Sequence, residues 1–138
     1  MIQEAARQEI ATIIAAMVAA HTDYPLVVET NNRDPVDQTT QTDPYFKVQI
    51  KWLGGEQKDL GPAPMVGQYG QILLAACVKE GSGEKAANVL MDFCAPYFER
   101  KALALLQTDM YLPMSDPILL GWYYVTGLVN FKCYRISA

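Results

Sequence analysis

The sequence has little of the equipment that enzymes and cofactor-binding domains use. It contains one histidine, His21, and three cysteines, Cys77, Cys94 and Cys133, which lie far apart. None of them occurs with the spacing of a metal-ligand set. A Gly-x-Ser-x-Gly elbow, a P-loop and the three-glycine dinucleotide fingerprint are all missing from the sequence. We therefore expect no enzymatic activity, no metal and no cofactor.

The residues that come closest to such motifs have simpler explanations. His21 follows an apolar helical segment, where a histidine complements the helix dipole. "GSGEK" at 81–85 joins a strand to a helix, and a tight turn with a helix cap explains it. Asp34, Asp37 and Asp43 have irregular spacing and no central glycine, which a calcium-binding loop would need.

Concentrated positive charge is also missing. The formal net charge is −4, and the 11 lysines and arginines are scattered, so we expect no specific binding of nucleic acid. The first 20 residues carry acidic side chains and a short, interrupted apolar run, which predicts neither a signal peptide nor a membrane span. The odd cysteine count then favours reduced thiols in a cytoplasm.

What the chain does contain is material for one well-packed domain. Its 138 residues are 51% hydrophobic, which favours a single folded domain over residues 1–138. Helical periodicity predicts a helix from about 2 to 19, and a second one after residue 81 that Pro96 kinks or breaks. Short or alternating apolar runs predict strands at "LVVET", at 45–53, at 68–80 and in the last 20 residues. The sequence thus predicts an α+β fold, a mostly antiparallel four-stranded mixed sheet with two helices packed on one face.

Two connections are long for so small a domain. "NNRDPVDQTTQTDP" spans 31–44 with one aliphatic residue, and a loop rich in glycine and proline is expected over 54–67. Loops of this length in a compact domain are usually functional or disordered.

An aromatic strip near the C-terminus is the other feature of note. Strand alternation divides it between two faces, and Trp122, Tyr124 and Tyr134 are expected on the face that the helices leave uncovered. Tyrosine and tryptophan are favoured at protein contacts, so Trp122 and Tyr124 are candidate interface residues, although an ordinary amphipathic surface explains them equally well.

In this order of elements, the whole chain resembles the small tail terminator proteins of long-tailed, lambda-like bacteriophages, the minor tail protein U family. The resemblance rests on an amphipathic helix that starts at the first residues, on "YPLVVETNN" leading into a polar loop, and on the strand "YFKVQIKWL". It continues through "QYGQILLAACVKEGSGEKAANVLMDFCAPYF", a strand, glycine turn and helix, and ends with "GWYYVTGLVNFKCYRIS". The likeness is one of element order, without an invariant motif.

The resemblance implies a structural role. Tail terminators form a hexameric ring on the end of the completed tail tube, stop its growth and present a surface for head–tail joining, without catalysis. It implies as partners other copies of the chain, the tail tube protein and a head completion or connector protein. It also implies assembly in the bacterial host's cytoplasm and a place in the virion, at the head-proximal end of the tail.

A ring subunit needs projecting loops for its contacts. On this reading Arg33, Asp34, Asp37, Lys58 and Asp59 are candidate contributors to the assembly interface.

Three other functions stay open from the sequence. Another head–tail connector or neck completion protein would have a similar size and also form a ring. A small ligand-binding α+β domain would use the uncovered sheet face, with Trp122, Tyr124 and Lys51, as a pocket. A cytoplasmic adaptor with a fixed dimer partner is the third.

Overall fold

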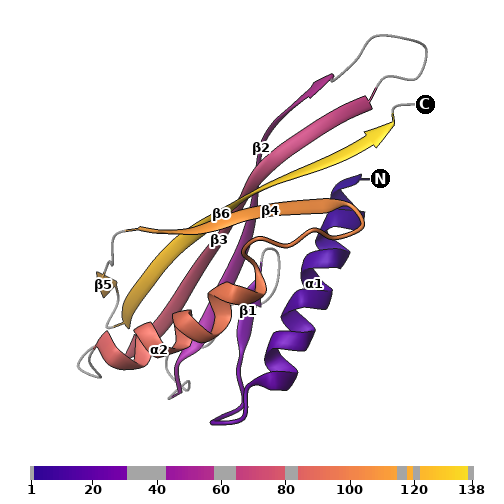
Figure 1. The fold of residues 1–138 in the computed structure, drawn as a ribbon. Coiled ribbons are helices and arrows are strands. Elements are labelled where there is room, and N and C mark those ends of the chain that lie inside the picture. Colours follow the sequence, from indigo (N-terminus) through magenta and orange to yellow (C-terminus); the bar gives the residue numbers. More distant parts are fainter. Residues whose placement is uncertain are drawn as a thin grey trace.

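A computed structural model describes residues 2–30, 43–57, 65–79, 84–114, 118–119 and 122–136. Two α-helices, α1 (Ile2–Ala20) and α2 (Glu84–Cys94), are accompanied by a short 3₁₀ helix, η1 (Ala95–Tyr97). The strands are β1 (Val28–Thr30), β2 (Tyr45–Gln57), β3 (Met65–Lys79), β4 (Leu106–Pro113), β5 (Ile118–Leu119) and β6 (Trp122–Ile136). Figure 1 shows one sheet with both helices on the same side of it.

The sheet is mixed and has more strands than the sequence predicted. Its order is β1-β2-β3-β6-β4, with β5 paired to the start of β6. Strand β1 is parallel to β2, and the other pairs are antiparallel. The predicted α+β class is confirmed, but the prediction of four strands is wrong because it missed β4 and β5. Strand β4 lies at the edge of the sheet, carries a bulge between Thr108 and Tyr111 and ends at Pro113, and an edge is where a strand tolerates proline.

The sequence predicted that the first long strand ends at Gly54 and Gly55, and this prediction is wrong. The strand passes through a bulge between Trp52 and Gly54 and continues to Gln57, while β3 already begins at Met65. A Cβ on Gly55 would lie 3.0 Å from the carbonyl oxygen of Gly67 on β3. Glycine is therefore used here for a close approach of two strands. The prediction of a loop over 54–67 is wrong at both ends, because 54–57 belong to β2 and 65–67 belong to β3. Of the predicted loop, the part that lies outside the described residues is 58–64.

The main core lies between the helices and one face of the sheet. Phe46 and Val48 of β2, Ile72 and Leu74 of β3, and Val129 and Phe131 of β6 all point into it. From α1 it receives Ala6, Ile10 and Met17, as the helical periodicity predicted, and from α2 it receives Ala87, Leu90, Met91 and Cys94. The expected break at Pro96 is confirmed, because α2 ends at Cys94 and passes into η1.

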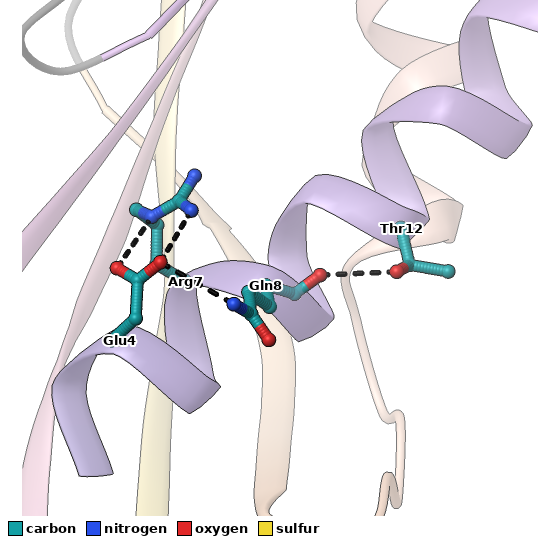
Figure 2. A network of polar contacts seen from close by, with 4 residues as sticks. All are labelled: Glu4, Arg7, Gln8 and Thr12. Carbon is teal, nitrogen blue, oxygen red and sulfur yellow. Dashed lines mark hydrogen bonds and ion pairs between the residues drawn. The ribbon is translucent and has the colours of Figure 1, made fainter. Parts of the chain in front are cut away.

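The polar side of α1 is organised in its first turns. Glu4 accepts two hydrogen bonds from the Arg7 guanidinium, at 2.9 and 2.6 Å, and a longer one from Gln8 (Figure 2). The Thr12 hydroxyl donates to the Gln8 carbonyl, four residues earlier. Beyond Thr12 the exposed positions of the helix are alanines, so its outward surface there carries no charge.

The half-buried Glu9 side chain joins α1 to the start of β4, and we call this contact the Glu9 clamp. Both carboxylate oxygens of Glu9 accept backbone hydrogen bonds, from Leu105 N–H at 2.8 Å and from Leu106 N–H at 3.0 Å. The 99–103 segment then runs beside β4, with Thr108 N–H donating to the Lys101 carbonyl at 2.8 Å. These bonds occupy part of the outer edge of β4, which an exposed edge strand would otherwise offer to another chain.

Replacing Glu9 with alanine should leave two amide groups of this turn without their acceptors. We expect the free energy of unfolding to fall by about 1–3 kcal/mol, the usual cost of an unsatisfied, partly buried donor. Glu9→Gln keeps one acceptor oxygen and should lose less. Urea denaturation of the three proteins measures this, and equal stability of Glu9→Ala and the wild type would show that water replaces the clamp without cost.

Candidate interaction surface

The face of the sheet opposite the helices is a candidate surface, and we call it the open face. Cross-strand pairing assigns its members, because directly paired residues point to the same side. The open face consists of Glu29; Tyr45, Lys47, Gln49 and Lys51; Tyr69, Gln71, Leu73, Ala75, Cys77 and Lys79; and Trp122, Tyr124, Thr126, Leu128, Asn130 and Lys132. Neither helix contributes a residue to the cluster of buried side chains on this side.

At one end of the open face, aromatic side chains pack against one another and leave little of their surface exposed. Trp122 and Tyr124 are only 3% and 6% exposed, and they pack with Tyr45 and Cys77. The Tyr45 and Trp122 rings meet edge to face with centroids 5.1 Å apart. Trp122 and Tyr124 thus lie on the predicted face but expose little surface there, and their role at an interface stays a prediction. Strand alternation placed them on the correct face, but it does not report how closely side chains on neighbouring strands cover one another.

Burial in this cluster makes Cys77 a poor nucleophile. Burial raises the pKa of its thiol to about 12, from an ordinary value near 9.0, and does the same to Cys94 on the helix side. Cys133 is buried too, and all three thiols are free. Since the thiolate is the reactive form, these groups serve as small apolar side chains at neutral pH.

The raised thiol pKa values predict a loss of stability in alkali. A thiol whose pKa is higher in the folded state stabilises the fold below its unfolded pKa, and this stabilisation is lost as the pH rises from about 9 toward 12. We expect the urea midpoint of the wild type to fall over this range more steeply than that of a Cys77→Ala, Cys94→Ala double variant. Parallel pH profiles for the two proteins would contradict this.

The open face is basic along its length, from Lys79 beside Trp122 to Lys51 and Lys132. Lys47 pairs with Glu29 at 3.7 Å, and its ammonium lies 5.3 Å from the centre of the Tyr124 ring. The exposed Lys51, Lys79 and Lys132 form no ion pair with any acid in the part of the chain that the structure describes. A chain with a net charge of −4 therefore has a sheet face on which positive charge predominates.

Exposed apolar groups accompany these lysines. Tyr69 of β3 is 42% exposed and is paired with Lys132 of β6. Leu112 of β4 is also 42% exposed and is paired with Leu128 of β6. Leu73 and Leu128 are half-buried. A mixture of aromatic and aliphatic groups with polar ones is typical of protein–protein contact surfaces.

The remaining predicted interface residues lie elsewhere. Arg33, Asp34, Asp37, Lys58 and Asp59 are outside the described residues, so their predicted role stays a prediction.

His21 is held by its surroundings in a structural role. It directly follows α1, its Nδ1–H donates to the Tyr24 carbonyl at 3.0 Å, and its ring packs edge to face against Tyr24 and Phe93. Within the described ranges, no three histidine, cysteine or acidic side chains gather as a metal site would require. No helix among those ranges is long and apolar enough to span a membrane.

Comparison with known proteins identifies the fold and nothing more specific. No protein family profile and no curated protein sequence matches the chain. A solved structure, whose name states no function, superposes with a TM-score of 0.74 over 96% of both chains, at 12% sequence identity. At that identity the similarity shows a shared fold only, and the fold extends over almost the whole chain.

Proposed function

We propose that this chain is a phage tail terminator, which assembles into a hexameric ring on the end of the tail tube, stops its polymerisation and receives the head's connector protein. The proposal starts from the resemblance in element order over the whole sequence. It places the protein at the head-proximal end of the tail in the virion, after assembly in the bacterial cytoplasm. Its partners are other copies of itself, the tube protein and the head completion protein.

The observation that supports it best is a sheet much longer than its helical cover. Strands β3 and β6 have 15 residues each, against a usual strand length of about 5–6. At about 3.3 Å per residue each is about 50 Å long. Helix α1, with 19 residues, is about 28 Å long. Figure 1 shows the β2–β3 hairpin extending beyond the helices.

Strands that extend beyond the helices give a small subunit a rigid surface for contacts with other subunits. One side of it is the open face, with exposed lysines and apolar groups, and the outward side of α1 adds a surface without charge beyond Thr12. A ring subunit needs at least two different surfaces for its two neighbours, because ring contacts are heterologous. The predicted loop 31–44, and the part of the predicted loop 54–67 that belongs to neither β2 nor β3, 58–64, are proposed as further contact elements toward the tube and the head.

A tube-length assay tests the function. Tail tube subunits are polymerised with and without the protein, and tube lengths are measured by electron microscopy. We expect elongation to stop and the protein to sediment with the tubes. Unchanged lengths with the protein left in the supernatant would contradict the proposal.

A second experiment tests the contact role of the loop. Shortening the 31–44 segment should give tubes of abnormal length or tails that do not join heads. Normal tails that join heads would remove the loop from the list of contact elements without affecting the proposal for the ring.

A further inference from the structure

The 99–103 segment covers the outer edge of β4 in the way an additional strand would. Leu103 N–H donates to the Leu106 carbonyl at 2.7 Å, and Thr108 N–H donates to the Lys101 carbonyl at 2.8 Å. Lys101 N–H in turn donates to the Thr108 hydroxyl at 2.6 Å. The two backbone bonds follow the antiparallel ladder pattern, so the segment occupies the place of a neighbouring strand. We call it the edge cover.

Side chains satisfy further backbone donors of β4 beyond the edge cover. Met110 N–H donates to the Asp109 carboxylate at 2.8 Å, and Tyr111 N–H donates to the Glu99 carboxylate at 2.9 Å. Pro113, the last residue of the strand, has no N–H. These groups are thereby withheld from a strand of another molecule.

Exposed apolar side chains make β4 prone to association once its edge is free. Met110, Leu112 and Met114 are 46%, 42% and 49% exposed. Leu112 is paired with Leu128 of the open face, and alternate residues of a strand point to the same side, so the three form one row. An uncovered edge strand with exposed apolar groups is a site where copies of a chain pair and aggregate.

We propose that the edge cover is an autoinhibitory contact, which keeps the β4 strands of two copies from pairing edge to edge. When the cover is displaced, a second copy offers the same edge, and the two strands pair antiparallel about a two-fold axis. The apolar rows of both copies then lie side by side. The inference does not depend on the proposed function, but it has a consequence for it: a two-fold pair closes on itself and withdraws subunits from a ring, whose contacts are heterologous.

Opening the cover tests the inference in the full chain. Glu99→Ala removes the acceptor of Tyr111 N–H, and Thr108→Val removes the hydroxyl that accepts from Lys101 N–H. In this double variant we expect the amide hydrogens of Tyr111 and Lys101 to exchange at least about tenfold faster than in the wild type. Sedimentation equilibrium should show an association constant at least about tenfold above that of the wild type. If the double variant proves too unstable to study, Thr108→Val alone should show both changes at smaller size.

A disulfide that locks the cover provides the critical comparison. Ala102 of the cover and Gln107 of β4 are exposed and directly paired, between the two backbone bonds described above. Such a pair without mutual hydrogen bonds has Cα atoms about 4.5 Å apart, within the range of about 4.4–6.8 Å that a disulfide spans. Adding Ala102→Cys, Gln107→Cys to the double variant should return association to the wild-type level when oxidised. A reductant should release it again, and the three native thiols are buried and do not compete.

The matched control is Lys101→Ala, which removes an exposed side chain of the cover and keeps the backbone bonds of the segment. Its amide exchange and its association should equal those of the wild type. Urea midpoints of all variants verify that they fold.

Three results would overturn the inference. The first is amide exchange in the double variant that is no faster than in the wild type, and the second is faster exchange without added association. The third is added association that persists in the oxidised, locked protein, since another surface would then be responsible. The tube-length assay decides the proposed function separately, because it uses the wild type, in which the cover is intact.

Discussion

Replacing Phe98 with alanine should destabilise the fold by about 3–5 kcal/mol, the usual cost of deleting a fully buried aromatic ring. Phe98 has no exposed surface and stacks on Phe46 of β2, with ring centroids 6.5 Å apart. It follows η1 directly, and its N–H donates to the Ala95 carbonyl at 3.0 Å. The ring therefore fills the place where the helical layer turns back toward the sheet. A loss of this size is a large part of the 5–15 kcal/mol that stabilises a typical domain.

Urea unfolding monitored by circular dichroism measures the effect. Phe98→Leu, which keeps most of the volume, should lose clearly less. Val89→Ala on the outward side of α2 is the surface control and should stay within about 0.5 kcal/mol of the wild type. A loss below about 1 kcal/mol for Phe98→Ala would mean that the core around Phe46 collapses into the space without strain.

Gly70→Ala should also be strongly destabilising, although it adds a single methyl group. A Cβ at Gly70 would overlap the backbone carbonyl oxygen of Lys51 and would lie 2.8 Å from the Phe131 ring. Gly70 belongs to β3, which is paired on both sides, so the Lys51 carbonyl can move only if the strand pairing moves with it. We expect a loss of about 1–3 kcal/mol or more, the range for overpacking in a close-packed interior.

Gly54→Ala is the matched control for this substitution. Its Cβ would meet the hydroxyl end of Tyr69 at 3.0 Å, and that exposed side chain is free to turn away. The urea midpoint should therefore fall much further for Gly70→Ala than for Gly54→Ala. If both substitutions had the same small effect, β2 and β3 would have room for a methyl group at Gly70, which contradicts the close approach of the two strands there.

The strands that were easiest to predict are those with one buried and one exposed face. In β2 the alternation of Phe46 and Val48 with Gln49 and Lys51 is visible in the sequence because the helices cover only one side of the sheet. Strand β4 was missed because Pro113 and a bulge disturb its pattern. The ends of β2 and β3 were missed because paired glycines usually indicate a turn, whereas Gly55 here permits close strand contact.

The candidate surface was predictable in its position but not in its composition. Alternation assigned Trp122 and Tyr124 to the side away from the helices, but their burial depends on Tyr45 and Cys77, which are neighbours only after strand pairing. The lysines of the open face are scattered in the sequence and gather in the sheet for the same reason. The Glu9 clamp joins residues about a hundred positions apart, and no local pattern indicates it.

We propose that this chain acts by fitting its surface to copies of itself on the tail tube. Averaged electron microscopy of tube ends, after incubation with the protein, tests this most directly. The proposal predicts six-fold density at one end, formed by a closed ring of this fold in which successive subunits repeat the same contact. Bare tube ends, or protein bound singly along the tube wall, would contradict it.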